Sequence, residues 1–138
     1  MQLTKKYLND LTYEINGAAI EVHKILGPGL LESVYHECMK YELDLRGVPY
    51  KSELSAPINY KGLKTEGDLR CDLWIEDFIV VELKAVNEMH PIFDATLITY
   101  MNLLKSPKGI LYNFNVVNLF REGQKTIVNE LFRSLPDK

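Results

Sequence analysis

Two acidic residues and a lysine occupy neighbouring segments of the chain at a spacing that suits metal-assisted chemistry. Glu82 and Lys84 close the apolar run that begins at Phe78, and its β-branched and aromatic residues predict a β-strand. Residues i and i+2 of a strand share one face, so both side chains point the same way, about 7 Å apart. Charged groups on a mostly apolar strand are costly to bury without a partner or a use.

Asp72 is a second acid, on the alternating segment that precedes this strand. The length of the connecting loop decides whether the two acids meet. A two-residue turn would place Asp72 and Glu82 on opposite faces of the sheet. A three-residue loop over 76–78 would pair Ile75 with Ile79 and set Asp72 directly across from Glu82. The loop lacks the Asn-Gly or Asp-Gly pair of a two-residue turn, so a shared site requires the odd-length loop or a bulge.

Two carboxylates with a neighbouring ammonium suit a divalent cation beside an attacking water or a phosphate. The simpler interpretation of Glu82 and Lys84 is an ion pair at a strand edge. The alternation also predicts that Cys71, Leu73 and Ile75 share the opposite face from Asp72. Nearby charges, namely Glu66, Asp68 and Arg70, are expected on the exposed face, with Arg70 able to pair with Asp72.

Composition limits the class of protein. The chain has 138 residues, 46% hydrophobic and 25% charged, which suits one globular domain over residues 1–138. A net charge of −3 excludes a broad basic surface, so any nucleic-acid contact must use a local patch. No apolar run is long enough to span a membrane and no secretory signal is visible, so a cytoplasmic protein is expected. Cys38 and Cys71 lack metal-ligand spacing and are expected as reduced core thiols.

Hydrophobic periodicity predicts an α+β (α/β) chain with the element order ααββββαββ and a mixed β-sheet flanked by helices. The predicted helices cover about 8–25, 31–46 and 91–104, and the predicted strands cover 49–54, 56–61, 68–75, 78–84, 109–114 and 116–120. Residues 124–133 fit a strand and a helix equally well. The Gly27-Pro28 pair is expected to end the first helix, and a turn at Gly62 to close a hairpin.

Several short motifs resemble a known family. The G-x-x-E-x-x-Y motif is present from Gly29 to Tyr35. A segment that matches the core strand of the family runs from Glu82 to Val86, and its hairpin motif is matched by Tyr60-Lys61-Gly62. Over nearly its whole length the chain resembles the GxxExxY family, which is placed in the PD-(D/E)XK nuclease-like superfamily. The resemblance implies a restriction-endonuclease-like core with a metal site at the rim of the sheet.

The resemblance also implies roles for individual residues. Asp72 and Glu82 would bind Mg²⁺ or Mn²⁺ directly, and the carbonyl of Leu83 would add a third ligand. Glu32 would be a further ligand or would orient a metal-bound water. Lys84 would position the nucleophilic water or stabilise charge on the phosphate. Considered alone, Glu32 is a first-turn helix acid favoured by the helix dipole.

The helix after the core strand departs from the family pattern. Tyr100 matches the tyrosine of a QxxxY-like motif, and Thr96 stands where the family usually has Gln. Phe93 stands where the family often has His. Thr96 cannot offer the amide donor and acceptor of a glutamine, which affects substrate positioning. Tyr100 fits a core aromatic as well as a functional one.

These observations predict a metal-dependent nuclease that hydrolyses phosphodiester bonds, with Glu32, Asp72, Glu82 and Lys84 as catalytic residues. Nucleic acid is the expected partner, and DNA is favoured over RNA. The alternative is a weakened nuclease-like fold that binds nucleic acid or protein without cutting. A homo-oligomer is left open. His36, one helical turn after Glu32, has the spacing to support the site, but a solvated or packing residue is favoured. His90 is expected to contact a helix end.

Overall fold

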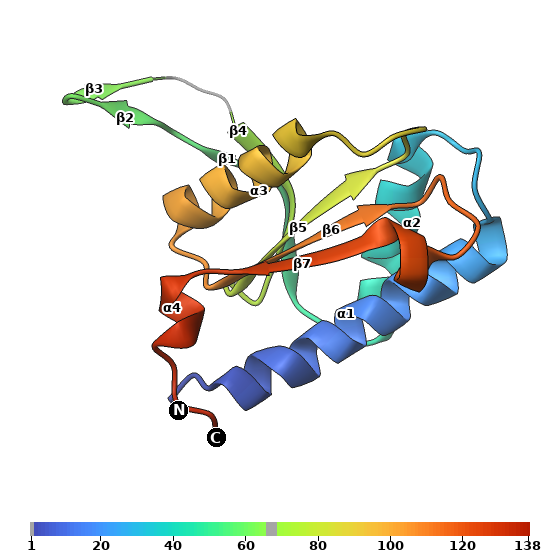
Figure 1. Cartoon of the computed structure of the whole chain (residues 1–138), viewed down its shortest axis with the longest axis horizontal. Helices are drawn as coiled ribbons and strands as arrows, with labels where there is room; N and C mark the ends of the chain where they lie inside the picture. The colour runs from blue at the N-terminus through green and yellow to red at the C-terminus, as the bar shows by residue number, and fades with distance from the viewer. Residues whose placement is uncertain (1, 66–68) are drawn as a thin grey trace.

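Five strands form a mixed sheet in the order β1-β4-β5-β6-β7 (Figure 1). The structure is a computed structural model that describes residues 2–65 and 69–138. Strand β5 pairs with β6 in parallel, and the other neighbours are antiparallel. The strands are β1 (Tyr50–Ala56), β4 (Leu69–Ile75), β5 (Ile79–Lys84), β6 (Lys108–Asn113) and β7 (Gln124–Val128). This arrangement confirms the predicted mixed sheet of a restriction-endonuclease-like core.

Helices cover both faces of the sheet (Figure 1). The helices are α1 (Lys5–Leu26), α2 (Glu32–Leu45), α3 (Pro91–Leu104) and the short α4 (Glu130–Arg133). Helices α1 and α2 share a core with Val81 and Leu83 of β5. Helix α3 packs against the opposite face through a smaller cluster that includes Val80 and Leu97. Side chains alternate along a strand, so Glu82 and Lys84 lie on the α3 face. No helix among the described residues is long and apolar enough to cross a membrane.

The turn between α1 and α2 is held by Tyr35. Gly27 ends α1 with a φ of 68°, a conformation that favours glycine, as predicted. The Tyr35 hydroxyl donates to the Gly27 carbonyl at 2.6 Å, and the Leu30 amide approaches that hydroxyl at 3.2 Å. The Tyr35 ring stacks on Phe114 at 4.6 Å between centroids. The tyrosine of the G-x-x-E-x-x-Y motif therefore positions the turn and the start of α2, where Glu32 lies.

The segment after β6 differs from its prediction. Residues 116–120 were expected to form a strand, but Leu119–Gly123 form a single π-helical turn, η1. The Asn118 side chain caps this turn by accepting from the Arg121 amide at 3.0 Å. A Cβ added to Gly123 would lie 2.2 Å from the Asn113 carbonyl, so glycine permits this turn to pack against the end of β6. The ambiguous stretch 124–133 forms β7 and then α4.

The chain between β1 and β4 forms a second, two-stranded sheet of β2 (Asn59–Tyr60) and β3 (Leu63–Lys64). The turn at Gly62 is confirmed, because Lys61 and Gly62 have φ values of 50° and 91°. The predicted strand over 56–61 is shorter than expected, and β3 was not predicted. Glu66 and Asp68, expected as exposed strand charges, lie outside the described residues.

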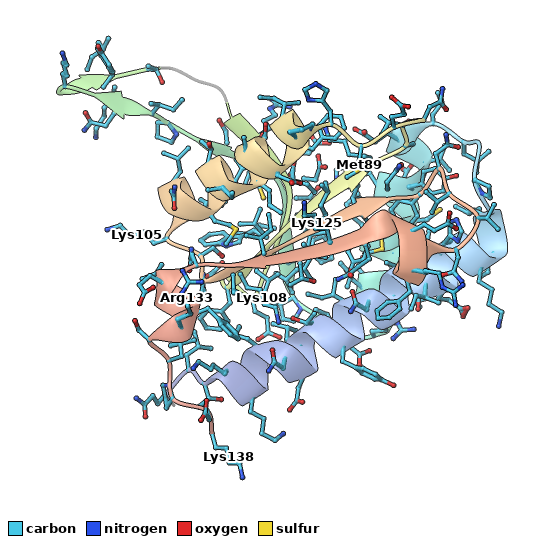
Figure 2. The ribbon with its side chains drawn as sticks, in the orientation of Figure 1. Met89, Lys105, Lys108, Lys125, Arg133 and Lys138 are labelled. Atoms are coloured by element: carbon cyan, nitrogen blue, oxygen red, sulfur yellow. The ribbon has the colours of Figure 1, made fainter. Side chains whose placement is uncertain are left out.

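A buried lysine joins the C-terminal segment to the first helix. Lys108 lies between α1 and α4 (Figure 2). Its Nζ donates to Asn9 Oδ1 at 3.0 Å and lies 5.4 Å from the centroid of the Phe132 ring. Burial lowers the pKa of Lys108. The ends of the chain are therefore tied together on the side of the sheet away from α3.

We expect Tyr35→Phe to lower the free energy of unfolding by about 1–2 kcal/mol, because two hydrogen bonds are lost while the ring stack remains. Urea unfolding of this variant and of Tyr13→Phe would measure the effect. Tyr13 is 80% exposed and serves as the matched control. Equal stabilities for the two variants would show that the Tyr35 hydroxyl does not hold the turn.

Candidate active site

The pairing of β4 with β5 sets the position of the two acids. Ile75 pairs with Ile79, and Leu73 pairs with Val81, so the connecting loop is the three-residue loop over 76–78. The predicted register is confirmed, and Asp72 lies opposite Glu82. The loop is closed by the Phe78 amide, which donates to the Ile75 carbonyl at 2.9 Å. An odd-length loop therefore brings the two carboxylates to one place.

At Asp72, hydrogen bonds from main chain to side chain replace the main-chain hydrogen bonds that pair β4 with β5. The Asp72 amide donates to Glu82 Oε2 at 2.8 Å, and the Leu83 amide donates to Asp72 Oδ2 at 2.8 Å. Each carboxylate thus takes the place of a main-chain acceptor on the opposite strand. Among the described residues, no hydrogen bond involves the second oxygen of either group, Asp72 Oδ1 or Glu82 Oε1. The two acids lie side by side with one oxygen each left available.

The strand is irregular at this point, which corrects one expectation. Ser52 pairs with Leu73 and Leu54 pairs with Cys71, but the intervening Glu53 and Asp72 are absent from the ladder. Glu53 has a φ of 51°, in the left-handed region. Cys71, predicted to share a face with Leu73, packs instead in the cluster under α3. The interruption of the strand pairing at Asp72 overrides simple alternation.

Both acids hold protons more tightly than usual. Burial, followed by the charge of Asp72, raises the pKa of Glu82 to about 8, although the Asp72 amide and Lys84 act in the opposite direction. Burial also raises the pKa of Asp72, against the Leu83 amide and the positive charges of His36 and Lys84. The Glu82 side chain is 5% exposed, so water offers it little stabilisation. The folded structure therefore favours the protonated form of Glu82.

Lys84 lies beside the two acids without being locked to either. Its charge lowers the pKa of Asp72, of Glu82 and of Glu32. Its Nζ lies 4.6 Å from the centroid of the Phe93 ring on α3, a cation–π distance. Among the described residues it forms no direct ion pair. The ammonium therefore stays available on the face that the carboxylates occupy.

Glu32 reaches the rim of this group from a different element. It is the first residue of α2, and its side chain retains access to solvent. Partial burial raises the pKa of Glu32, with Lys84 opposing and Asp72 adding to the rise. In the described part of the chain, no three His, Cys, Asp or Glu side chains converge closely enough to hold one ion. Glu32 thus lies near the pair but outside a shared coordination sphere.

His36 contacts the main chain beside the site, whereas the sequence favoured a solvated or packing residue over a supporting contact. Its Nε2 lies 3.2 Å from both the Asp72 carbonyl and Ser52 Oγ. Its Nδ1 lies 3.8 Å from Glu53 Oε1. The spacing of one helical turn from Glu32 was the available signal, but only the fold brings α2 against β4. His36 holds the main chain that carries Asp72. His90 caps α3 by accepting from the Ile92 amide at 3.0 Å, which confirms the expected helix-end contact.

The two α3 residues proposed for substrate positioning make internal contacts. The Tyr100 hydroxyl donates to the Arg70 carbonyl at 2.6 Å and is 6% exposed. Burial and then the charge of Glu82 raise the pKa of Tyr100 to about 12, so it stays protonated. The Thr96 hydroxyl donates to the Ile92 carbonyl of its own helix at 2.9 Å. Arg70 lies 3.7 Å from Glu53 and does not pair with Asp72.

A side-chain clamp fixes the chain where β5 ends. Asn113, the last residue of β6, accepts from the Val86 amide and donates to the Val86 carbonyl, both at 3.0 Å. The same Asn113 oxygen accepts from the Asn115 amide at 3.2 Å. These bonds hold the segment that follows Lys84 beside β6.

We expect the free energy of unfolding to fall as the pH rises from about 4.5 to about 8, because only the folded protein keeps Glu82 protonated over that range. Glu82→Gln should weaken this dependence and be more stable than the parent at pH 8. Urea unfolding from pH 5 to 9 would measure it, with exposed Glu37→Gln as the control. Parallel curves for the parent and Glu82→Gln would contradict the raised pKa.

Comparison with known proteins is informative at the level of the family. The model of the family described as the PD-(D/E)XK nuclease superfamily matches residues 9–127, a range that includes every residue of the site. No significant match is found among curated proteins or among solved structures.

Proposed function

The chain belongs to the PD-(D/E)XK nuclease superfamily, and on this premise we propose that it is a metal-dependent nuclease that hydrolyses phosphodiester bonds in DNA. One observation carries the proposal. Asp72 and Glu82 are side by side between β4 and β5, each with one oxygen free, and Lys84 lies beside them without an ion-pair partner among the described residues. Paired acids with a neighbouring ammonium suit phosphodiester hydrolysis.

The donor set fits a hard divalent cation, Mg²⁺ or Mn²⁺. Carboxylate oxygens are the preferred ligands of both ions, and a cation would offset the burial and the repulsion by Asp72 that raise the pKa of Glu82. We propose Asp72 and Glu82 as ligands, with the main-chain oxygen of Leu83 as a third. Glu32 would act through a water molecule, because it does not converge with the pair. The ion, when bound, would lower the pKa of a water and neutralise charge on the phosphate.

The chain's own residues would position the reactants. Lys84, on the same face as the carboxylates, would hold the attacking water or stabilise the negative charge on a phosphate oxygen. Phe93 would keep the Lys84 ammonium in place through the ring contact. Glu32, at the start of α2, would orient water at the rim. Tyr100 and His36 would keep β4 in position through the carbonyls of Arg70 and Asp72.

Within the superfamily, we propose a relationship to the GxxExxY family. The motif from Gly29 to Tyr35 supports this proposal, because its glutamate reaches the rim of the site and its tyrosine holds the turn. The second candidate function is a nuclease-like module that binds without cutting. Thr96 favours it, since its hydroxyl is taken by its own helix and offers the substrate no amide.

We expect Mn²⁺ or Mg²⁺ to support cleavage of labelled DNA, and EDTA to abolish it. Glu82→Gln and Lys84→Met should each lower the cleavage rate by about 10²-fold or more, because each removes a group that acts on the reacting atoms. Glu37→Gln, on the exposed side of α2, serves as the control. Substrates should include single- and double-stranded DNA and RNA. Equal rates in all variants would point to a contaminating nuclease.

We expect Mn²⁺ to raise the melting temperature of the parent protein through binding linkage, by an amount equivalent to about 2.7 kcal/mol at 100 times Kd. Glu82→Gln should lose this increase, and Glu37→Gln should retain it. An equal rise in the parent and Glu82→Gln would place the ion elsewhere. Metal binding without cleavage of any nucleic acid would favour the binding module.

A further inference from the structure

The β2–β3 arm, defined as residues 57–65, extends away from the rest of the fold (Figure 1). Both of its strands are exposed along their length. Tyr60 pairs directly with Leu63, and the two side chains are 61% and 64% exposed. Directly opposed residues share a face, so the arm presents an aromatic and an aliphatic side chain together to solvent. The folded core does not explain this apolar face.

The arm is basic although the chain is acidic. Lys61 and Lys64 lie on the arm, no acidic residue occurs between 57 and 65, and the whole chain has a net charge of −3. The Lys61 Nζ lies 5.4 Å from the centroid of the Tyr60 ring. A local concentration of positive charge beside an aromatic ring matches the chemistry of a nucleic-acid strand, which presents phosphates and base faces together.

Local hydrogen bonds give the arm a defined shape. Asn59 Oδ1 accepts from the Gly62 amide at 3.0 Å across the turn. At the base of the arm, the Thr65 amide donates to the Ile58 carbonyl at 2.9 Å, and Thr65 Oγ1 accepts from the Ile58 amide at 3.2 Å. A segment that is already ordered loses less entropy when it binds a partner. The arm is therefore preformed for contact.

The arm begins at the end of the sheet that carries the two acids. Glu53 on β1 lies opposite Asp72 on β4, and the chain from Glu53 reaches Tyr60 after seven residues. At an upper limit of about 3.6 Å per residue, Tyr60 lies within about 25 Å of Glu53, and the step to Asp72 on the neighbouring strand adds about 5 Å. A duplex rises about 3.4 Å per base pair, so the arm lies within about nine base pairs of a phosphate held at the site.

We propose that the β2–β3 arm is a nucleic-acid contact that grips the strand beside the phosphate held at the carboxylate pair. Lys61 and Lys64 contact phosphates, and the face formed by Tyr60 and Leu63 lies against sugars and bases. This proposal rests on the proposed nuclease function. The competing occupant is a second copy of the chain, whose apolar groove between α1 and α2 is lined by residues including Ile25, Tyr41 and Leu45. The basic charge and the emergence of the arm from the strand next to Asp72 favour nucleic acid.

The test measures binding apart from cleavage. Fluorescence anisotropy with 30-nucleotide single-stranded and duplex DNA, in EDTA, would compare the parent with Lys61→Ala/Lys64→Ala and with Tyr60→Ala. The double variant should bind about tenfold more weakly at low salt, and its slope of log K against log salt should shrink by about 1.4–1.8. Tyr60→Ala should weaken single-strand binding by about fivefold or more.

The matched control is Lys6→Ala/Lys138→Ala, which removes the same charge. Lys138 lies at the opposite side of the molecule from the arm (Figure 2), and Lys6 lies near Lys138 because its amide donates to the Asp137 carbonyl at 3.0 Å. This control should bind within twofold of the parent. Circular dichroism would verify that every variant is folded. Sedimentation velocity would report the oligomeric state of each variant.

Unchanged DNA affinity in both arm variants would overturn the proposal, and so would a parent protein that binds no DNA. Loss of a dimer with unchanged DNA affinity would assign the arm to a second copy instead. Failure of the nuclease function has a different signature, namely no cleavage with Mn²⁺ while the arm variants still weaken binding.

Discussion

The exchange of hydrogen bonds between Asp72, Glu82 and the opposite main chains is the interaction on which the rest of the structure depends. It ends the regular ladder between β4 and β5 and holds two carboxylates together in a largely dry position. The surrounding contacts all secure this break in the sheet. Tyr100 binds the main chain before Asp72, His36 binds the carbonyl of Asp72 itself, and Asn113 clamps the chain after β5.

This arrangement costs stability where it provides chemistry. Burial of the Glu82 carboxyl next to Asp72 opposes its ionisation in the folded protein, as the raised pKa of Glu82 shows. The cost is offset elsewhere, in the core that α1 and α2 form with β5 and in the Tyr35–Phe114 stack. Proteins commonly concentrate unfavourable electrostatics at their working sites and support them with ordinary packing around them. The two faces of the sheet divide these tasks, with the larger core on one side and the charged groups towards α3.

The structure assigns contacts to Tyr35 and Phe93 that could not be predicted from their positions in the sequence motifs. Tyr35 works as a structural residue, because its hydroxyl holds the Gly27 carbonyl and so aims the start of α2, with Glu32, at the rim of the site. Phe93 lies beside the Lys84 ammonium and supplies it with a cation–π contact from α3.

The sequence by itself determined the elements whose signals are local. Hydrophobic periodicity predicted α1, α2 and α3, and the turns at Gly27 and Gly62 followed from the access of glycine to positive φ. The alternation of side chains along a strand required the odd-length loop that pairs Ile75 with Ile79.

Only the tertiary structure decided the rest. Of the strand expected over 116–120, residues 119–120 instead begin a π-helical turn, in which Gly123 packs against the Asn113 carbonyl, a contact between segments that local propensity cannot report. Cys71 changed face because the pairing of β4 with β1 is interrupted at Asp72, and His36 joined the site because α2 packs on the sheet within reach of the Asp72 carbonyl. The pKa of Glu82 likewise depends on burial by elements far apart in the chain, which no spacing of residues encodes.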